Sequence, residues 1–258
     1  MKVPLHIVKA RRAELADLLR RHQYLPLAEV CTRLGVSEAT ARRDLSALQQ
    51  ERAITRTHGG AIYEYNQSFP SFQERRDQQS TSKQRIAEAA YKLIKPTDVV
   101  WLDGGTTCYA IASLLATKPV GPLTIVTNNL PAAERLADND DVAVHISGGQ
   151  YFRRSGLLVP GKALDGLRAW NFDLAFLGAE GLTPEGLWNS IADVVNMQRA
   201  VAACARRAIY CVDSTKIGKR AEAFLAPIAE VEHLLSDAPL SALKSARIRM
   251  GARRLIAA

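Results

Sequence analysis

The chain has 258 residues, of which 47% are hydrophobic, and it carries 34 Lys and Arg against 26 Asp and Glu for a formal net charge of +8. This length suits one small domain followed by one of medium size, each with an apolar core. The apolar runs are too short to span a membrane and the N-terminus lacks the pattern of a signal peptide, so we expect no membrane segment.

The first predicted elements are two helices joined by a sharp turn. Gly35 can adopt the positive φ that such a turn requires, and Ser37 can cap a second helix over residues 38–50. Apolar residues at i, i+3, i+4 and i+7 place one face of the first helix inward, and a similar stripe does so for the second. The two stripes are Leu27, Val30, Cys31 and Leu34, and Ala41, Leu45 and Leu48.

The second helix has polar residues where a DNA-recognition helix would use them. The residues that we predict to contact DNA from this helix are Ser37, Thr40, Arg42 and Arg43. An arginine can bind guanine O6 and N7 together, and a threonine hydroxyl suits a base or a phosphate. Asp44 would orient an arginine, because phosphate repels a carboxylate. The alternative is a solvated helix face with ordinary i,i+4 ion pairs, but the turn before the helix and the hairpin after it favour DNA.

A basic hairpin, the wing, is expected over residues 53–62. Arg56 would reach a phosphate or a narrow minor groove, where negative potential is concentrated. His58 would either contact DNA or act as a hinge. Residues 1–62 contain 11 Lys and Arg against 6 Asp and Glu, whereas the rest of the chain contains 23 against 20. The basic excess therefore lies in residues 1–62, which we predict to be a winged helix-turn-helix domain that binds double-stranded DNA.

The remaining chain is predicted to be a linker over residues 63–82 and an α/β domain over residues 83–258. The linker is polar and poorly periodic, although Phe69 and Phe72 are expected to dock on a domain. Apolar strands that alternate with amphipathic helices indicate an open, mostly parallel sheet covered on both faces. We expect strands at 99–102, 123–126, 142–146, 174–177, 209–212 and 231–235, and helices from about 82 to 95 and at 108–116, 131–137, 161–169 and 192–207.

Five of these strands end in glycines and polar residues. In an open α/β sheet the carboxyl ends of the strands face one crevice where ligands bind, so we expect a single polar pocket built from five loops. The loops are residues 103–107, 127–129, 147–149, 178–181 and 213–216.

The residues of this pocket predict an anionic ligand that carries hydroxyl groups. Residues 104–107 lie between a strand and a helix start, where free amides and the helix dipole can hold a phosphate. Lys216 adds a cation, and Asp103 and Asn128 suit sugar hydroxyls. The alternative is that the glycines and threonines are only turn and cap residues; the segment is neither a P-loop nor the dinucleotide fingerprint. The expected effector-binding residues are Asp103, Gly104, Gly105, Thr106, Thr107, Asn128, Gly149, Glu180 and Lys216.

The cysteines show no C-x-x-C spacing, and two of them fall on apolar helix faces; they are Cys31, Cys108, Cys204 and Cys211. This favours small hydrophobic side chains in a reducing cytoplasm over disulfides or a zinc site. We expect no metal and no cofactor.

Several motifs together resemble the DeoR-type transcriptional repressors of sugar catabolism. They are LGVSEATARRDLSALQQ and RTHGGA in the first domain, FQERR and SKQRIAEAA at the junction, and LDGGTTCYAIASLL, TIVTNN, SGGQYFRR, DLAFLGAEGL and VDSTKIG beyond it. The resemblance implies a second domain that looks like the ribose-5-phosphate isomerase and CoA-transferase fold and binds a small phosphorylated sugar or polyol. It places Asp103, Gly105, Thr106, Thr107 and Lys216 on the effector-site motifs. It also implies a homo-oligomer that represses a sugar or polyol operon until the effector releases it.

The alternative from a different class is an enzyme. An isomerase or CoA-transferase of this fold with a DNA-binding appendage would need an acid/base set such as Asp103, Glu180 and Lys216. Glu180 would be its best candidate for a catalytic carboxylate. A switch needs only binding, which favours the regulator.

Overall fold

The structure is a computed structural model, and it describes residues 4–22, 24–50, 54–56, 60–63, 70–160, 164–250 and 255–258. The chain divides into an N-terminal unit that ends at Pro70 and a C-terminal unit that begins at Ser71.

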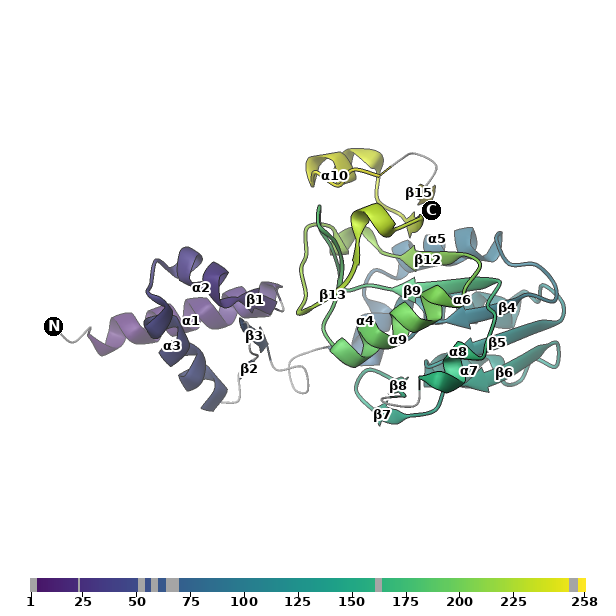
Figure 1. The fold of residues 1–258 in the computed structure, drawn as a ribbon, viewed down its shortest axis with the longest axis horizontal. Coiled ribbons are helices and arrows are strands. Elements are labelled where there is room, and N and C mark those ends of the chain that lie inside the picture. The colour runs from purple at the N-terminus through teal and green to yellow at the C-terminus, as the bar shows by residue number, and fades with distance from the viewer. Residues whose placement is uncertain are drawn as a thin grey trace. The chain divides into compact units, whose positions relative to one another are not determined.

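The N-terminal unit is a winged helix-turn-helix, as the sequence predicts (Figure 1). Its three strands form one antiparallel sheet in the order β1-β3-β2. Gly35 has φ 61° and closes α2 by donating its amide to the Cys31 carbonyl, which is the left-handed turn expected there. The elements are α1 Leu5–His22, β1 Tyr24–Pro26, α2 Leu27–Leu34, α3 Glu38–Gln50, β2 Ile54–Arg56 and β3 Gly60–Tyr63.

The core of this unit contains the expected stripes of α2 and α3 and a contribution from α1 that the sequence analysis did not predict. Ala41, Leu45 and Leu48 of α3 are at most 4% exposed. From α1, Leu15 and Leu19 are fully buried against them. The long N-terminal helix therefore closes the core beneath the recognition helix.

The C-terminal unit is built on a seven-stranded parallel sheet in the order β15-β14-β12-β9-β4-β5-β6. This confirms the predicted open α/β fold, and six of the seven strands were predicted. The strands are β4 Val99–Leu102, β5 Leu123–Thr127, β6 Val142–Ile146, β9 Leu174–Gly178, β12 Ala208–Cys211, β14 His233–Ser236 and β15 Leu255–Ala257.

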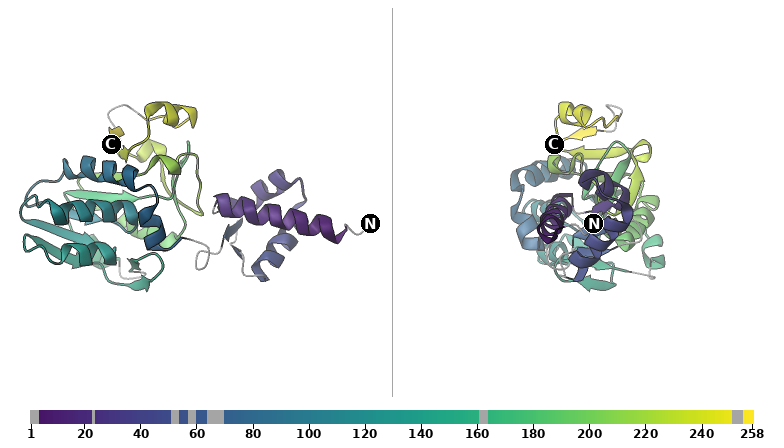
Figure 2. Two further views of the ribbon diagram at one scale, coloured as in Figure 1. Left: turned by 180° about the vertical axis from the view of Figure 1, so that it is seen from behind. Right: turned by 90° about the vertical axis from the view of Figure 1, so that its left-hand side faces the viewer.

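Helices cover both faces of the sheet, and each face has its own core. One face packs against α5 Ser80–Tyr91, α6 Thr106–Thr117 and α7 Leu130–Leu136 (Figure 2). The other packs against α9 Ala192–Ala203 and a small antiparallel sheet of β10 Gly181–Leu182, β11 Gly186–Asn189 and β13 Ala223–Pro227. The remaining elements are β7 Gln150–Phe152, β8 Leu157–Val159, α8 Asp165–Arg168, α10 Leu240–Ser245 and the 3-10 turns η1 Ser214–Lys216 and η2 Ile228–Glu230.

The predicted linker contains regular structure at its C-terminal end. Helix α4, Phe72–Asp77, begins with a capping box in which the Ser71 hydroxyl accepts the Glu74 amide and the Glu74 carboxylate accepts the Ser71 amide. Phe72 docks as expected, since it is 8% exposed and meets the Tyr109 ring edge to face at 5.3 Å. Phe69 lies outside the described residues. A polar helix of six residues has too little periodicity to be recognised from its pattern, but the capping box was a usable signal.

Three predicted helices end earlier or are shorter than expected, and the first of them, predicted from about 82 to 95, is α5 and ends at Tyr91. The helix predicted over 161–169 is present only as α8, with residues 161–163 outside the described part, and the helix predicted over 192–207 ends at Ala203. Among the helices that the structure describes, none combines the length and the apolarity needed to traverse a bilayer.

Candidate functional site

The N-terminus of α3 presents the residues predicted to contact DNA. Ser37 is exposed, and its hydroxyl accepts the Thr40 amide at 3.4 Å and lies 3.0 Å from the Thr40 hydroxyl. The cap expected from the sequence is therefore present, and it fixes two hydroxyls side by side at the start of the helix.

The two arginines of α3 differ in what holds them. Arg42 forms an i,i+4 ion pair with Glu38 at 3.1 Å, which is the solvated-face arrangement considered as the alternative. Arg43 is exposed and makes no ion pair with any residue in the described part of the chain. Arg43 is therefore the better placed of the two to bind an incoming base.

Asp44 orients arginines, as predicted, but they come from α1. Its carboxylate is buried and accepts Arg11 Nε at 2.6 Å and Arg12 Nε at 3.0 Å. Burial alone would raise the pKa of Asp44, but the hydrogen bonds and charges of Arg11 and Arg12 outweigh it and hold that pKa below its usual value. This cluster ties α1 to the recognition helix.

The wing residues are only partly described. The backbone of Arg56 ends β2 and pairs with Ala61 of β3, which confirms the predicted hairpin strands. His58 lies outside the described residues. Contacts of both residues with DNA stay predictions.

The second site lies at the carboxyl ends of β12, β9, β4 and β5, which are neighbours in the sheet. The chain leaves β4 toward β5 in one direction, and later elements extend the sheet from β9 in the other. The boundary between β4 and β9 is therefore the switch point at which open α/β sheets bind ligands. Asp103 follows β4 and joins the two strands, because its Oδ2 accepts the Gly178 amide at 2.9 Å.

Asp103 is the most strongly buried charge of this site. It is 2% exposed, and the fully buried Gln198 of α9 donates its Nε2 to Asp103 Oδ2 at 2.5 Å. Burial raises the pKa of Asp103 to about 6, although the hydrogen bonds from Gly178 and Gln198 act in the opposite direction. Gln198 also donates to the Gly178 carbonyl at 2.7 Å and accepts Asn189 Nδ2 at 2.8 Å. Gln198 is thus a positioning residue that the sequence analysis missed.

Residues 104–107, which were predicted to hold a phosphate, lead from β4 into the first turn of α6. Gly105 is the residue before α6, with φ 98°, and no side chain caps the helix, so its first amides are available to a ligand. Gly104 packs closely, since a Cβ there would lie 3.1 Å from Leu157 Cβ and 3.3 Å from Asn128 Nδ2. Thr106 is buried and Thr107 is half-buried in the first turn.

The end of β5 is tied to the end of β4 by buried side chains. The Thr127 hydroxyl bonds the Leu102 carbonyl at 2.5 Å, and Asn129 Nδ2 donates to the Gly105 carbonyl at 2.9 Å. Asn128 donates its Nδ2 to the Leu158 carbonyl at 3.1 Å, while its buried Oδ1 has no hydrogen-bond partner among the described residues. That orphaned oxygen is a free acceptor for a ligand hydroxyl.

Glu180 lies within electrostatic range of two cations, Lys216 and Arg75 of α4. Burial raises the pKa of Glu180, whereas the Ser190 hydroxyl that it accepts and the charges of Arg75 and Lys216 act in the opposite direction. Lys216 ends the η1 turn, in which Asp213 caps the Thr215 amide at 3.0 Å. The structure therefore brings together a carboxylate from the end of β9 and a cation from the end of β12.

Lys83 of α5 completes a cluster of three cations. It is 6% exposed and donates its ammonium to the carbonyls of Arg75 and Gln78 at the end of α4. The pKa of Lys83 is lowered to about 8, chiefly by burial; the charge of Asp213 opposes this shift, and the charges of Lys216 and Arg75 contribute to it. The cations are Arg75, Lys83 and Lys216, and we call them the basic cluster.

Gly149 has a structural reason to be glycine. Its φ is 111°, and a Cβ there would lie 2.3 Å from the Val159 carbonyl oxygen, so only glycine permits this close approach of backbone. It follows β6 at the sheet edge, and its role toward an effector stays a prediction.

Arg75 was missed because α4 was assigned to the linker, and Lys83 because its contacts with α4 were not foreseen. Their burial and mutual approach depend on how α4 docks on the unit, which no local pattern encodes. The described residues contain no group of three metal-ligating side chains.

An exposed recognition helix on one unit and a polar, cationic switch point on the other define a class, the transcription regulator that carries its sensor on the same chain. Residues 11–67 match the DeoR-like helix-turn-helix domain and residues 78–238 match the DeoR C terminal sensor domain. The chain belongs to the DeoR family of DNA-binding transcription regulators. Family membership sets aside the enzyme alternative.

Similar proteins span almost the full length of the chain. The glycerol-3-phosphate regulon repressor of Escherichia coli is 30% identical over 89% of this chain and 90% of its own. The HTH-type transcriptional repressor GlcR of Bacillus subtilis is 29% identical over 88% and 87%. Among solved structures, ribose 5-phosphate isomerase A of Methanocaldococcus jannaschii is 18% identical over 52% of each chain with a TM-score of 0.38, a limited likeness that concerns the fold alone.

Proposed function

We propose that this protein is a cytoplasmic homo-oligomeric repressor of a sugar or polyol catabolic operon, released from its DNA operator by a small phosphorylated sugar or polyol. The observation that carries the effector class is that Lys216 of the basic cluster and the uncapped N-terminus of α6 follow the carboxyl ends of β12 and β4, the two strands that flank β9. Burial lowers the pKa of Lys83 to about 8 and the charges of Lys216 and Arg75 act in the same direction, so a bound anion would stabilise the charged form of Lys83. The name of one relative makes glycerol 3-phosphate a first candidate.

Each part of the site has a chemical role in this proposal. The amides of residues 104–107 and the basic cluster hold the phosphate. Asp103, Asn128 and Glu180 bind hydroxyls, since each offers an oxygen acceptor in a buried setting. The effector draws the strand-end loops together and shifts the linker, so the recognition helices no longer match their half-sites. Linkage requires only that the effector bind the released state more tightly.

The first test is a thermal-shift screen of the full chain with glycerol 3-phosphate, pentose phosphates, hexose phosphates and their unphosphorylated counterparts. A ligand at 100 times its Kd stabilises by about 2.7 kcal/mol. We expect a shift from a phosphorylated compound only, and the same compound should release operator DNA in an anisotropy titration. An effector that binds yet leaves operator affinity unchanged would show that the coupling is wrong. If the protein were an activator, operator binding in the same titration would require the effector.

Replacement of Arg43 by Ala should weaken operator binding by about 1–3 kcal/mol, because the unpaired arginine is placed to bind a base edge. The matched control is Arg42→Ala, which removes an arginine already paired with Glu38. Anisotropy titrations with operator and random DNA at one salt concentration distinguish the roles. An equal loss on both DNAs for Arg43→Ala would make it a phosphate contact.

Lys216→Ala and Thr107→Val should each leave operator binding intact and raise the effector concentration needed for release by tenfold or more. The reason is that one removes a cation of the basic cluster and the other a hydroxyl from the first turn of α6. Release curves measured alongside operator titrations check this. Simultaneous loss of DNA binding and release would mean that these residues are structural.

A further inference from the structure

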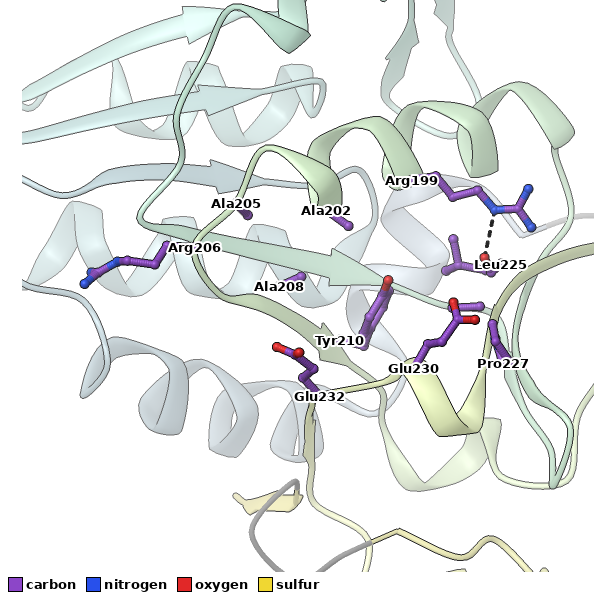
Figure 3. A pocket seen from close by; sticks show the side chains of 11 residues that line it. Arg199, Ala202, Ala205, Arg206, Ala208, Tyr210, Leu225, Pro227, Glu230 and Glu232 are labelled. Atoms are coloured by element: carbon purple, nitrogen blue, oxygen red, sulfur yellow. Dashed lines mark hydrogen bonds between the residues drawn. The ribbon is translucent and has the colours of Figure 1, made fainter.

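An open groove lies on the side of the sheet that carries α9, apart from the switch point (Figure 3). It has a volume of about 600 Å³ and lies between α9, β12 and the segment from β13 to β14. Small apolar side chains form much of its lining, namely Ala202, Ala205, Ala208, Ala226 and Pro227. Such a lining lets another backbone approach closely.

The charges of the groove are segregated onto opposite walls. The α9 wall carries Arg199, and the wall from η2 to β14 carries Glu230 and Glu232 (Figure 3). Arg206, on the segment between α9 and β12, also lines the groove and pairs with Asp173 at 3.4 Å. Arg199 is fixed in place, because its Nε donates to the Leu225 carbonyl at 2.9 Å and its Nη2 to the Phe224 carbonyl at 2.8 Å. Within the described part of the chain, neither Arg199 nor either glutamate has an ion-pair partner.

The floor holds a polar group that lacks a partner. Tyr210 of β12 is 6% exposed, and its ring rises into the groove in Figure 3. Its hydroxyl makes no hydrogen bond to any described residue and is not one of the buried polar atoms that lack a partner, so it is open to the groove. Burial raises the pKa of Tyr210; the charge of Arg199 opposes this rise, and the charges of Asp103 and Glu230 add to it.

We propose that a second copy of this chain covers the groove across a twofold axis, with Arg199 of each copy facing Glu230 and Glu232 of the other. A twofold interface must be complementary to itself. A groove with one cationic and one anionic wall meets that condition, because the twofold rotation brings the cationic wall of each copy against the anionic wall of the other. A singly charged small ligand would instead meet repulsion from one wall. The proposal gives a surface to the homo-oligomer of the proposed function and rests on it.

Two complementary variants of the full chain test the interface. Arg199→Glu makes both walls negative, and Glu230→Arg combined with Glu232→Arg makes both positive. Sedimentation equilibrium should show each variant alone falling toward the 28.2 kDa of one chain, with the dissociation constant of the dimer raised at least tenfold. An equimolar mixture should regain the wild-type mass, because every contact between the two variants then joins opposite charges. Intrachain effects cannot produce that rescue.

Further variants separate folding from association. Arg199→Glu also removes the hydrogen bonds to β13, so Ala202→Arg, which keeps Arg199 and obstructs the α9 wall, is the second test and should also lower the mass. The matched control is Glu134→Arg on α7, which is exposed on the opposite face of the sheet. This variant should keep the wild-type mass.

The proposal is overturned if wild type is oligomeric and all three groove variants keep its mass, which is also the result expected of a small-molecule site. Failure of the mixture to regain mass overturns it as well. If the wild-type protein has the mass of one chain at micromolar concentration, the homo-oligomer of the proposed function is overturned as well. Effector-dependent release of DNA, the other part of the proposed function, can still be measured in that case.

Discussion

Replacement of Asp44 by Ala is expected to destabilise the N-terminal unit by about 2–4 kcal/mol, because it leaves Arg11 and Arg12 without the buried carboxylate that joins α1 to α3. The Arg11 and Arg12 side chains are 17% and 32% exposed, so partial hydration offsets part of the loss. Hydrogen exchange of the amides of α1 and α3 in the full chain measures the change. Operator affinity should fall with it, since α1 and α3 would open together.

The control for Asp44 is an exposed ion pair in the same unit. Glu29→Ala on α2 removes the pair with Arg33 at 2.7 Å, which should contribute at most about 1 kcal/mol. Because the pKa of Asp44 is held below its usual value, its stabilisation is present above that value and is lost as pH falls through the folded-state pKa. Below about pH 4 the free energy of opening obtained from exchange should therefore fall more in wild type than in Asp44→Ala. The contribution of the Asp44 ion pairs to stability would be refuted by an equal fall in wild type and Asp44→Ala, or by an equal loss of stability in Asp44→Ala and Glu29→Ala.

Asp44 also shows what the sequence reveals and what it does not. The α2 and α3 stripes, Gly35 and the Ser37 cap are local, because each depends on neighbours within one or two helical turns. The arginines that Asp44 binds come from more than 30 residues away. Sequence spacing therefore predicted that Asp44 binds arginine and could not identify which one.

The strand ends show the same division. Apolar strands that alternate with helices predicted the sheet, and its parallel order then brought Asp103, Asn128, Glu180 and Lys216 to one edge. Lys83 and Gln198 were missed because they sit in helices, where a single polar residue on a buried face has no distinct pattern. Their contacts with α4 and Asp103 arise only when the layers pack.

Replacement of Asp103 by Asn is expected to raise the free energy of unfolding of the C-terminal unit at pH 7 by about 1–3 kcal/mol, because it removes a buried charge whose pKa is raised to about 6. An Asn oxygen in the place of Oδ2 can keep the bonds from Gly178 and Gln198, which both end on that atom. Denaturant unfolding followed by tryptophan fluorescence reports on this unit, since all the tryptophans, Trp101, Trp170 and Trp188, belong to it.

The pH dependence identifies the cause of that gain. A raised folded-state pKa means that the native state binds more protons than the unfolded chain between about pH 4 and 6, so wild-type stability falls as pH rises through this window. The two proteins should be equally stable near pH 4 and diverge up to pH 6. Asp138→Asn, an exposed control, should show no divergence.

The effector response decides what the charge of Asp103 is for. If Asp103 accepts a ligand hydroxyl, the more stable Asn variant should need at least tenfold more effector to release operator DNA, because an amide is a weaker acceptor than a carboxylate. A gain in stability together with a loss of response means that the buried charge serves the ligand. A gain in stability with an unchanged response would remove Asp103 from the effector site.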